Sequence, residues 1–337
     1  MSIITVIGSG VMGSAMSFPA ADNGHTVRLV GTMLDREIID HAKKTNHHLN
    51  LNRALPNGIE FYQLGNLQTA LIGADLIISG VSSFGVQWFA DVIIPVLPDG
   101  IPVLSVTKGM FNNPDGSLTS YPKYYSQKTP SGDFCAVGGP CTSYELADRD
   151  NTHVCFCGKD IDSLKKIKTL LETDYYHISL STDIEGLECA VAIKNAYALA
   201  VTLAVGLSLK ESDTIRYNSQ AALFGQSIRE MRGLFKLFGC NDDNITYGAG
   251  DLYVTVFGGR TRKIGTLLGQ GHSFKAAMNE LSGVTLESVV ITERIGEAVM
   301  KSITEGKTAA DQYPLLLHIY DIITKDALVD IPWDKFG

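Results

Sequence analysis

Glycine and lysine residues are the ones whose type and spacing could carry chemistry in this 337-residue sequence. Gly8, Gly10 and Gly13 form a G-x-G-x-x-G motif directly after the apolar run Ile3–Ile7. The first glycine of such a motif permits a tight turn, the second lets a pyrophosphate approach the backbone, and the third lets a helix pack close to a strand. The N–H groups at the start of the following helix then face the phosphates. We therefore predict that residues 8–13 bind a dinucleotide, the alternative being an ordinary strand–turn–helix with spare glycines.

Lys194 is the most informative residue after these glycines. It lies half-way along the most apolar predicted helix, and Asn195 beside it offers an amide for hydrogen bonds. A buried ammonium either finds a partner or loses its proton, and a lysine with a lowered pKa can exchange a proton near neutral pH. We predict an acid/base role, the alternative being a lysine whose ammonium reaches the surface.

The segment 248–265, GAGDLYVTVFGGRTRKIG, is a second candidate site. If Asp251 begins a helix, Thr255 lies one turn later on the same face, and the two glycines that follow end that helix. Arg260 then offers a planar fork suited to a phosphate, and Arg262 and Lys263 add positive charge. The alternative is a solvated surface turn.

Lys108 is a third candidate, because it follows the apolar run Val103–Val106 in the motif SVTKG. Ligands of open α/β sheets bind at the carboxyl ends of the strands. Gly139, in GGP after another apolar run, is predicted at the same edge. A lysine on a surface loop is the alternative.

The elements that must position these residues alternate in the first half of the chain. Continuous apolar runs, typical of parallel strands covered on both faces, lead us to predict strands at 3–7, 27–30, 76–81, 103–106, 134–137 and 154–156. Helical patterns fall at 35–44, 86–94 and 161–171. This arrangement predicts a doubly wound α/β domain over residues 1–181.

The second half, residues 182–337, is predicted to be all-helical. Thr182 and Glu185 form a capping box before a helix that runs to about Val205 and is apolar almost all round. Further helical patterns fall at 219–238, 274–281, 286–302 and 311–324. With no linker between the halves, we expect a tight junction with a ligand cleft there.

Composition excludes several classes of protein. The net charge of −8 argues against nonspecific nucleic-acid binding, and an anionic substrate needs a local positive pocket. We find no apolar stretch of the ~20 residues that a membrane-spanning helix needs. No signal peptide is visible before the first strand, so we predict a cytoplasmic protein. The six cysteines and eight histidines form no metal pattern, and Cys155 and Cys157 are interpreted as buried thiols rather than a redox pair.

The end of the second predicted strand bears on the choice between NAD and NADP. Enzymes that use NAD usually place an acidic residue there, which bonds the ribose 2′-OH. Here Gly31 and Thr32 occupy that place, and Arg36 comes soon after. We predict that NADPH is used, and even preferred, with Thr32 and Arg36 near the ribose; the alternative is that Asp35 curls back and restores a preference for NAD.

Together these motifs resemble the NAD(P)-dependent glycerol-3-phosphate dehydrogenases over nearly the whole chain. The resemblance rests on GSGVMG at 8–13, VSSF at 81–84, VTKG at 106–109, GPCTSYE at 139–145, the helix with Lys194, GDLYVTVFGGRTRK at 250–263 and TLES at 285–288. It implies a Rossmann domain followed by an all-α domain, often in a homodimer. It also implies reversible hydride transfer between a nicotinamide and C2 of dihydroxyacetone phosphate.

The resemblance also implies roles for individual residues. Lys194 resembles the catalytic acid/base, Lys108 the lysine that contacts substrate and cofactor, and Asp251 and Thr255 substrate-site residues. Arg260 resembles the arginine shared between the substrate phosphate and the cofactor. The remaining positions on the cofactor side are Ser9, Val11, Met12, Phe84, Ser143, Thr285 and Glu287, and those on the substrate side are Gly139, Cys141, Asn195 and Thr261.

Three positions depart from the family pattern, and two other functions remain open. Cys141 stands where serine or threonine is usual, Thr261 replaces an asparagine and Ser288 replaces a glycine. The hydroxyl of Thr261 can still donate to a phosphate. The alternatives are a reductase of a small keto or hydroxy acid, such as a ketopantoate reductase, and a dinucleotide sensor without catalysis.

Overall fold

The computed structural model describes residues 1–113, 118–283 and 286–337. It divides into two compact units, Met1–Phe111 with Thr119–Ile184 and Asn112–Leu118 with Glu185–Gly337. The last passage of the chain from the first unit to the second lies between Ile184 and Glu185, three residues after the boundary predicted from the sequence.

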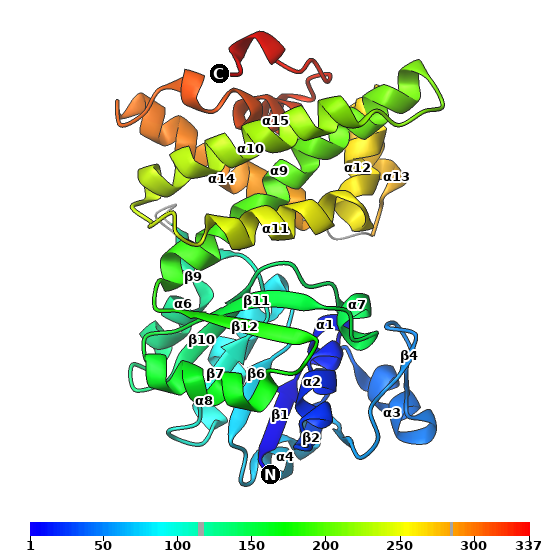
Figure 1. The fold of residues 1–337 in the computed structure, drawn as a ribbon, viewed down its shortest axis with the longest axis vertical. Coiled ribbons are helices and arrows are strands. Elements are labelled where there is room, and N and C mark those ends of the chain that lie inside the picture. Colours follow the sequence, from blue (N-terminus) through cyan, green and yellow to red (C-terminus); the bar gives the residue numbers. More distant parts are fainter. Residues whose placement is uncertain (114–117, 284–285) are drawn as a thin grey trace. The chain divides into compact units, whose positions relative to one another are not determined.

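The first unit is built on an eight-stranded sheet in the order β12-β11-β10-β7-β6-β1-β2-β5 (Figure 1). Its strands are β1 (Ile3–Ile7), β2 (Thr26–Val30), β5 (Glu60–Tyr62), β6 (Leu76–Ser79), β7 (Val103–Ser105), β10 (Phe134–Gly138), β11 (Thr152–Cys157) and β12 (Tyr176–Ser181). The six strands from β5 to β10 run parallel, which confirms the doubly wound prediction. The prediction for 154–156 was wrong in direction, because β11 pairs antiparallel with β10.

Two hydrophobic cores lie on the two faces of this sheet, because neighbouring residues of a strand point to opposite faces. Ile4 and Val6 of β1 belong to one core, together with Leu76 and Ile78 of β6. Ile7 belongs to the other core, with Ile77 and Val30 of the neighbouring strands. Burial on both faces explains why these strands read as continuous apolar runs.

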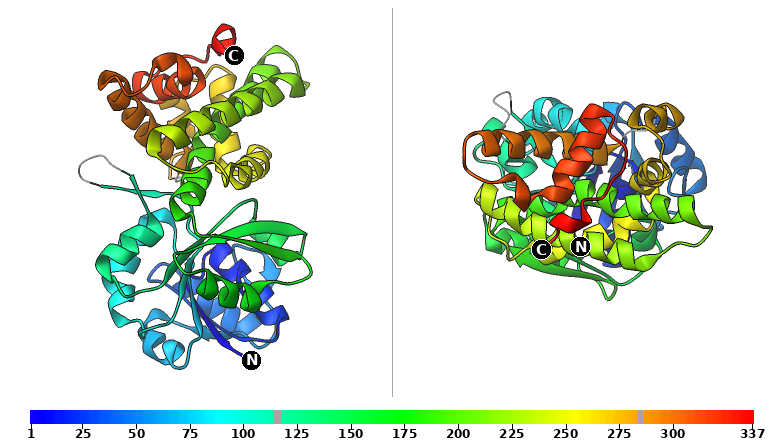
Figure 2. Two further views of the ribbon diagram at one scale, coloured as in Figure 1. Left: turned by 60° about the vertical axis from the view of Figure 1, so that its left-hand side comes forward. Right: turned by 90° about the horizontal axis from the view of Figure 1, so that it is seen from above.

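Helices cover both cores, as Figures 1 and 2 show. The first core is covered by α1 (Val11–Ala15), α2 (Ser17–Asp22), α3 (Arg36–Thr45), α7 (Ser143–Ala147) and α8 (Ile161–Leu171). The second is covered by α4 (Leu67–Leu71), α5 (Val86–Trp88) with the π and 3₁₀ turns that continue it to Val96, and α6 (Tyr121–Lys128). The predicted helix 161–171 is confirmed, whereas the one at 86–94 is irregular. Strands β5 and β12 and helices α6 and α7 were not predicted.

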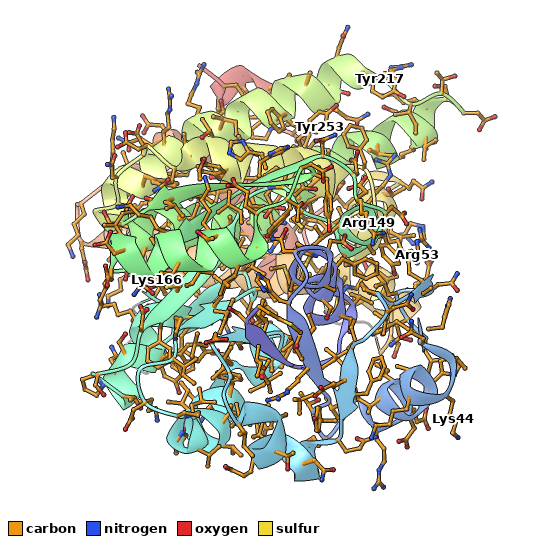
Figure 3. All side chains as sticks on the ribbon, turned by 60° about the horizontal axis from the view of Figure 1, so that its bottom comes forward. Lys44, Arg53, Arg149, Lys166, Tyr217 and Tyr253 are labelled. Atoms are coloured by element: carbon orange, nitrogen blue, oxygen red, sulfur yellow. The ribbon has the colours of Figure 1, made fainter. Side chains whose placement is uncertain are left out.

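Arg53 and Arg149, labelled in Figure 3, each form a two-fold hydrogen bond with an aspartate from a distant part of the first unit. Arg53 donates two hydrogen bonds to Asp148, 95 residues away. Arg149 donates two to Asp22, which also accepts from Tyr175. Arg53 belongs to β4 (Arg53–Ala54), which pairs with β3 (His47–His48). The ion pair between Arg53 and Asp148 therefore holds the β3–β4 hairpin beside α7.

The second unit is helical, as predicted. Its helices are α9 (Ile184–Glu211), α10 (Tyr217–Phe238), α11 (Ile245–Val256), α12 (Gly259–Gly269), α13 (Phe274–Glu280), α14 (Glu287–Thr304) and α15 (Pro314–Lys325). Among the described residues, β8 (Met110–Asn112) and β9 (Leu118–Ser120) form a second two-stranded sheet. We expected no apolar stretch long enough to span a bilayer, and this expectation was wrong at α9. By length and composition this helix could cross a membrane. However, 89% of its most apolar window is buried inside the protein, as in the core helix of a soluble domain.

A buried carboxylate joins three helices of this unit. Glu230 of α10 is fully buried, and its two oxygens accept from the backbone N–H groups of Leu315 and Leu316, at the start of α15. Tyr197 of α9 and Gln226 donate to the same carboxylate. Burial raises the pKa of Glu230, an effect that these four donors partly offset, and they hold α15 against α9 and α10.

Candidate functional site

The glycine-rich loop has the backbone geometry that its sequence predicts. Gly8 has a φ of +108°, and a Cβ there would lie 2.7 Å from the carbonyl carbon of Gly80. A Cβ on Gly13 would lie 2.1 Å from the carbonyl oxygen of Gly8, so α1 approaches the end of β1 as closely as backbones allow. A Cβ on Gly10 would meet nothing within 4 Å. The open space at Gly10 is where a pyrophosphate needs room, so the loop fits a dinucleotide.

Asp35 reaches back to this loop, contrary to our prediction that no carboxylate lies at the end of β2. Its Oδ2 accepts from the hydroxyl of Thr32 at 2.8 Å, from the N–H of Thr32 at 2.9 Å and from the N–H of Ser9 at 3.2 Å. The alternative arrangement is thus the observed one. Arg36 is exposed and begins α3.

A cavity of about 330 Å³ opens beside the loop in the first unit. Its lining residues are Gly8, Gly10, Thr32, Met33, Leu34, Asp35, Gly80, Val81, Ser82, Phe84, Gly85 and Trp88. Met33, Leu34 and Phe84 each expose more than 60% of their surface. Phe84 was predicted, whereas exposed Met33 and Leu34 and half-buried Trp88 of α5 were not, because apolar residues at a cavity have no sequence signature of their own.

Lys108 lies at the carboxyl edge of the sheet, as predicted. Its ammonium donates to the carbonyl oxygen of Gly139 at 2.8 Å, which joins the loops after β7 and β10. Gly139 has a φ of +120°, a conformation that favours glycine. Cys141 is half-buried nearby in the chain, and Ser143 is buried at the start of α7.

Lys194 has its partners within the second unit. Its ammonium lies 3.0 Å from Oδ1 of Asp251 and 2.8 Å from the hydroxyl of Thr255, two residues on α11. The side chains of Lys194 and Asp251 are 7% and 3% exposed. The hydroxyl of Thr255 donates to the carbonyl of Asp251 one turn earlier, so its oxygen faces the ammonium as an acceptor. Lys194 therefore does not reach the surface: the carboxylate compensates a buried charge, and we call these three residues the lysine cluster.

Helix boundaries around the arginines differ from our prediction. Asp251 lies in the middle of α11 rather than at its start. The glycine pair starts a helix: Gly258 caps α12, and Gly259 has a φ of +75°. Arg260 is exposed in the first turn of α12, whereas Arg262 donates to the carbonyl of Val256 at the end of α11. Arg262 thus has a structural contact, and Arg260 is the arginine exposed for a ligand.

The remaining predicted residues occupy ordinary positions. Asn195 is half-buried on α9, and Thr261 is half-buried on α12, where its carbonyl accepts a 3.4 Å hydrogen bond from Thr202. Val11 and Met12 pack against the sheet core. Glu287 is the first residue of α14 and Ser288 is buried behind it, while Thr285 lies outside the described residues.

Comparisons with known proteins decide the family. The family model for the N-terminus of NAD-dependent glycerol-3-phosphate dehydrogenase matches residues 3–163, and the model for the C-terminus matches residues 183–331. The chain belongs to the NAD-dependent glycerol-3-phosphate dehydrogenase family. Two curated relatives of this dehydrogenase are the NADP(+)-dependent glycerol-3-phosphate dehydrogenase of Archaeoglobus fulgidus, 34% identical over 83% of each chain, and a glycerol-3-phosphate dehydrogenase [NAD(P)+] of Desulfotalea psychrophila, 30% identical over 95% of this chain and 92% of the other.

Solved structures share the fold of this dehydrogenase. Glycerol-3-phosphate dehydrogenase from Coxiella burnetii superposes with a TM-score of 0.80 at 22% identity, covering 99% of this chain and 97% of that one. A ketopantoate reductase from Ralstonia eutropha gives a TM-score of 0.58 at 14% identity, covering 97% and 99%. The alternative of a keto-acid reductase is therefore a more distant likeness. The chain is an oxidoreductase that uses NAD(P) and acts on glycerol 3-phosphate.

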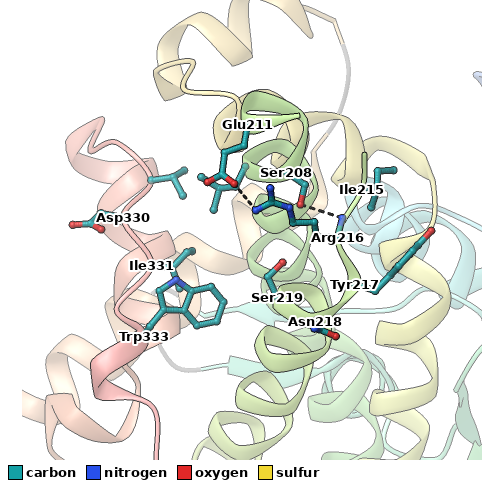
Figure 4. Close-up of a pocket in the computed structure, with 12 residues that line it drawn as sticks. Ser208, Glu211, Ile215, Arg216, Tyr217, Asn218, Ser219, Asp330, Ile331 and Trp333 are labelled. Carbon is teal, nitrogen blue, oxygen red and sulfur yellow. Dashed lines mark hydrogen bonds and ion pairs between the residues drawn. The ribbon is translucent and has the colours of Figure 1, made fainter. Parts of the chain in front are cut away.

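The dehydrogenase has another cavity in its helical unit that contains none of the predicted residues (Figure 4). It measures about 750 Å³ and lies between the end of α9, the start of α10 and the C-terminal segment with Trp333. Arg216 forms an ion pair with Glu211 on its wall at 2.6 Å. Since its arginine is already neutralised, this cavity does not offer the positive pocket that a phosphorylated substrate requires.

Proposed function

We propose that Lys194 is the acid/base of this dehydrogenase. When bound, the nicotinamide supplies the hydride that adds to C2 of dihydroxyacetone phosphate. The oxygen on C2 gains negative charge as hydride adds, and a buried ammonium is a suitable proton donor to it. In the reverse direction the same nitrogen takes the proton from the hydroxyl of glycerol 3-phosphate. The observation that carries this proposal is the lysine cluster, a charged lysine compensated by a carboxylate inside a helical core.

Asp251 and Thr255 are proposed as substrate-site residues that keep Lys194 ready for this transfer. Oδ1 of Asp251 and the hydroxyl of Thr255 both hold the ammonium, at 3.0 Å and 2.8 Å. The carboxylate stabilises the charged amine before the proton leaves, and the hydroxyl limits the directions in which its N–H bonds point. Asn195, next on α9, is proposed to bind a substrate hydroxyl.

Arg260 is proposed to bind the substrate phosphate, with the hydroxyl of Thr261 as a second donor. Its guanidinium is exposed in the first turn of α12, where the backbone N–H groups also favour an anion. Lys108, Gly139 and Cys141 are proposed to contact the substrate from the sheet edge.

A direct assay tests the proposal. The purified protein is mixed with dihydroxyacetone phosphate and NADH or NADPH, and absorbance of the reduced nicotinamide is followed. Oxidation of the cofactor with dihydroxyacetone phosphate, and not with ketopantoate, supports the proposed function. Binding of the cofactor without turnover of either substrate would instead favour the dinucleotide sensor.

Cofactor choice is proposed to be broad, with NADPH used and Arg36 facing its 2′-phosphate. The relative from Archaeoglobus fulgidus is named as NADP(+)-dependent, which supports this proposal. Asp35 keeps its negative charge, but its Oδ2 accepts from the N–H and hydroxyl of Thr32 and from the N–H of Ser9, which fixes the carboxylate against the glycine-rich loop. We therefore propose that Asp35 holds the loop rather than selecting the cofactor.

Two substitutions separate these roles, measured as kcat/KM for NADH and for NADPH. Arg36→Ala is expected to lower the value for NADPH several-fold and to spare NADH. Asp35→Asn is expected to lower both values alike. A strong preference for NADH that Arg36→Ala leaves unaltered and Asp35→Asn relieves would show that Asp35 selects NAD.

The remaining cofactor contacts are proposed at Gly8, Ser9, Gly10, Val11, Met12, Gly13, Thr32, Phe84, Ser143, Thr285 and Glu287. We also propose that the dehydrogenase works as a homodimer in the cytoplasm, without nucleic-acid or membrane partners. Cys155 and Cys157, both buried in β11, suit a reducing compartment. Sedimentation equilibrium measures the oligomeric state.

A further inference from the structure

A histidine outside the predicted site contacts the glycine-rich loop. His48, on β3, is fully buried, and its Nε2 lies 2.8 Å from the carbonyl oxygen of Ser9. The two residues are 39 positions apart in the chain. Ser9 is the residue between the first two glycines of the motif, so His48 contacts the loop at its centre.

The second ring nitrogen of His48 decides which tautomer is present. The N–H of Leu51 donates to Nδ1 at 2.9 Å, so Nδ1 is an acceptor and carries no proton. A neutral ring must then carry its proton on Nε2, which donates to Ser9. Burial lowers the pKa of His48, which outweighs the opposite effects of the Ser9 carbonyl and of Asp35. The ring is therefore neutral at pH 7, with one nitrogen for each contact.

The hydrogen bond to Ser9 also orients the next peptide N–H. A peptide group is planar, and in the trans form its C=O and N–H point in opposite directions. No described peptide bond is cis. With the carbonyl of Ser9 held by His48, the N–H of Gly10 points away from His48. The preceding peptide is held as well, because the N–H of Ser9 donates to Asp35.

We infer that His48 is a positioning residue for the cofactor: by fastening the carbonyl of Ser9 it presets the Gly10 N–H toward the pyrophosphate of NAD(P). Without this contact the peptide between Ser9 and Gly10 can rotate, and cofactor binding must order it again. The inference rests on the proposed binding of NAD(P) by this loop. It adds a residue that no motif identifies.

The test is a titration of NADH and of NADPH, without substrate, followed by the fluorescence of the bound nicotinamide. His48→Asn keeps an acceptor for Leu51 but is too short to reach Ser9, so Kd is expected to rise about 10-fold for both cofactors. His48→Gln places an amide N–H near the position of Nε2, so it is expected to retain most of the affinity. The matched control is His47→Asn, since half-exposed His47 is the neighbouring residue on the same strand and points to the opposite side.

Kinetics distinguish positioning from a general loss of structure. With saturating cofactor, His48→Asn is expected to keep kcat and the KM for dihydroxyacetone phosphate. A wild-type Kd in His48→Asn, or an equal loss in His48→Gln and His48→Asn, would overturn the inference. If neither variant folds, ¹⁵N spectra of the wild-type ring decide, because protonation at Nδ1 instead of Nε2 would contradict it. Should the wild-type protein bind neither cofactor, the proposed function fails instead.

Discussion

The glycine-rich loop and the lysine cluster differ in how far apart in the chain their residues lie and in what they provide. The loop is local: six consecutive residues, 8–13, leave space for a ligand because glycines remove side chains. The cluster is non-local: Lys194 meets Asp251 and Thr255 across 57 and 61 residues and buries a charge that needs a partner. In the proposed function, cofactor binding depends on backbone shape and proton transfer depends on helix packing, so variants should separate the two.

The largest expected effect is on the lysine cluster. Lys194→Met is expected to lower kcat by about 10²–10⁴, because no proton donor remains at the carbonyl oxygen. Its Kd for NADH is expected to stay unchanged, as measured by fluorescence titration. Near-normal turnover at saturating substrate would remove Lys194 from the mechanism.

Lys194→Met also leaves Asp251 buried without its cation, so the melting temperature of this variant is expected to fall. Adding Asp251→Asn is expected to restore much of that stability and none of the activity. This double variant separates lost chemistry from lost folding.

A smaller loss of about 10²-fold in kcat/KM is expected for Arg260→Ala. KM for dihydroxyacetone phosphate is expected to rise and kcat to fall, because phosphate binding also orients the carbonyl. Reduction of dihydroxyacetone, which lacks the phosphate, is expected to be insensitive to the change. Lys263→Ala, an exposed position on the same helix, is the matched control. An unchanged kcat/KM would mean that the phosphate lies elsewhere.

The smallest effects concern the loop, where two glycines are expected to differ. Gly13→Ala forces a Cβ against the carbonyl of Gly8, so thermal unfolding is expected to show a loss of about 1–3 kcal/mol. Gly10→Ala points its Cβ into open space, so stability is expected to change little while Kd for NADH rises about 10-fold. Equal effects of the two substitutions on stability would contradict the separate roles assigned to these glycines.

The sequence predicts local structure correctly where one element decides the outcome. The glycine spacing predicted the turn, and the apolar periodicity predicted α8 and the long helix that carries Lys194. The sequence predicts less where distant residues decide. The interpretation of the 248–265 segment assumed a helix that starts at Asp251, but α11 begins six residues earlier, at Ile245. The direction of β11 depends on its neighbour β10, which no feature of its own sequence reveals.

The sequence by itself determined the family, the glycine-rich turn and the succession of an α/β domain and a helical domain, and it named the candidate site residues, because these depend on residue type and short spacing. The tertiary structure decided which contacts those residues make. It pairs Lys194 with Asp251, turns Arg262 into a cap for α11 while Arg260 stays exposed, and brings Asp35 and His48 to the peptide groups of Ser9. Such contacts depend on how helices and strands far apart in the chain pack, and packing is a property of the whole fold rather than of any segment.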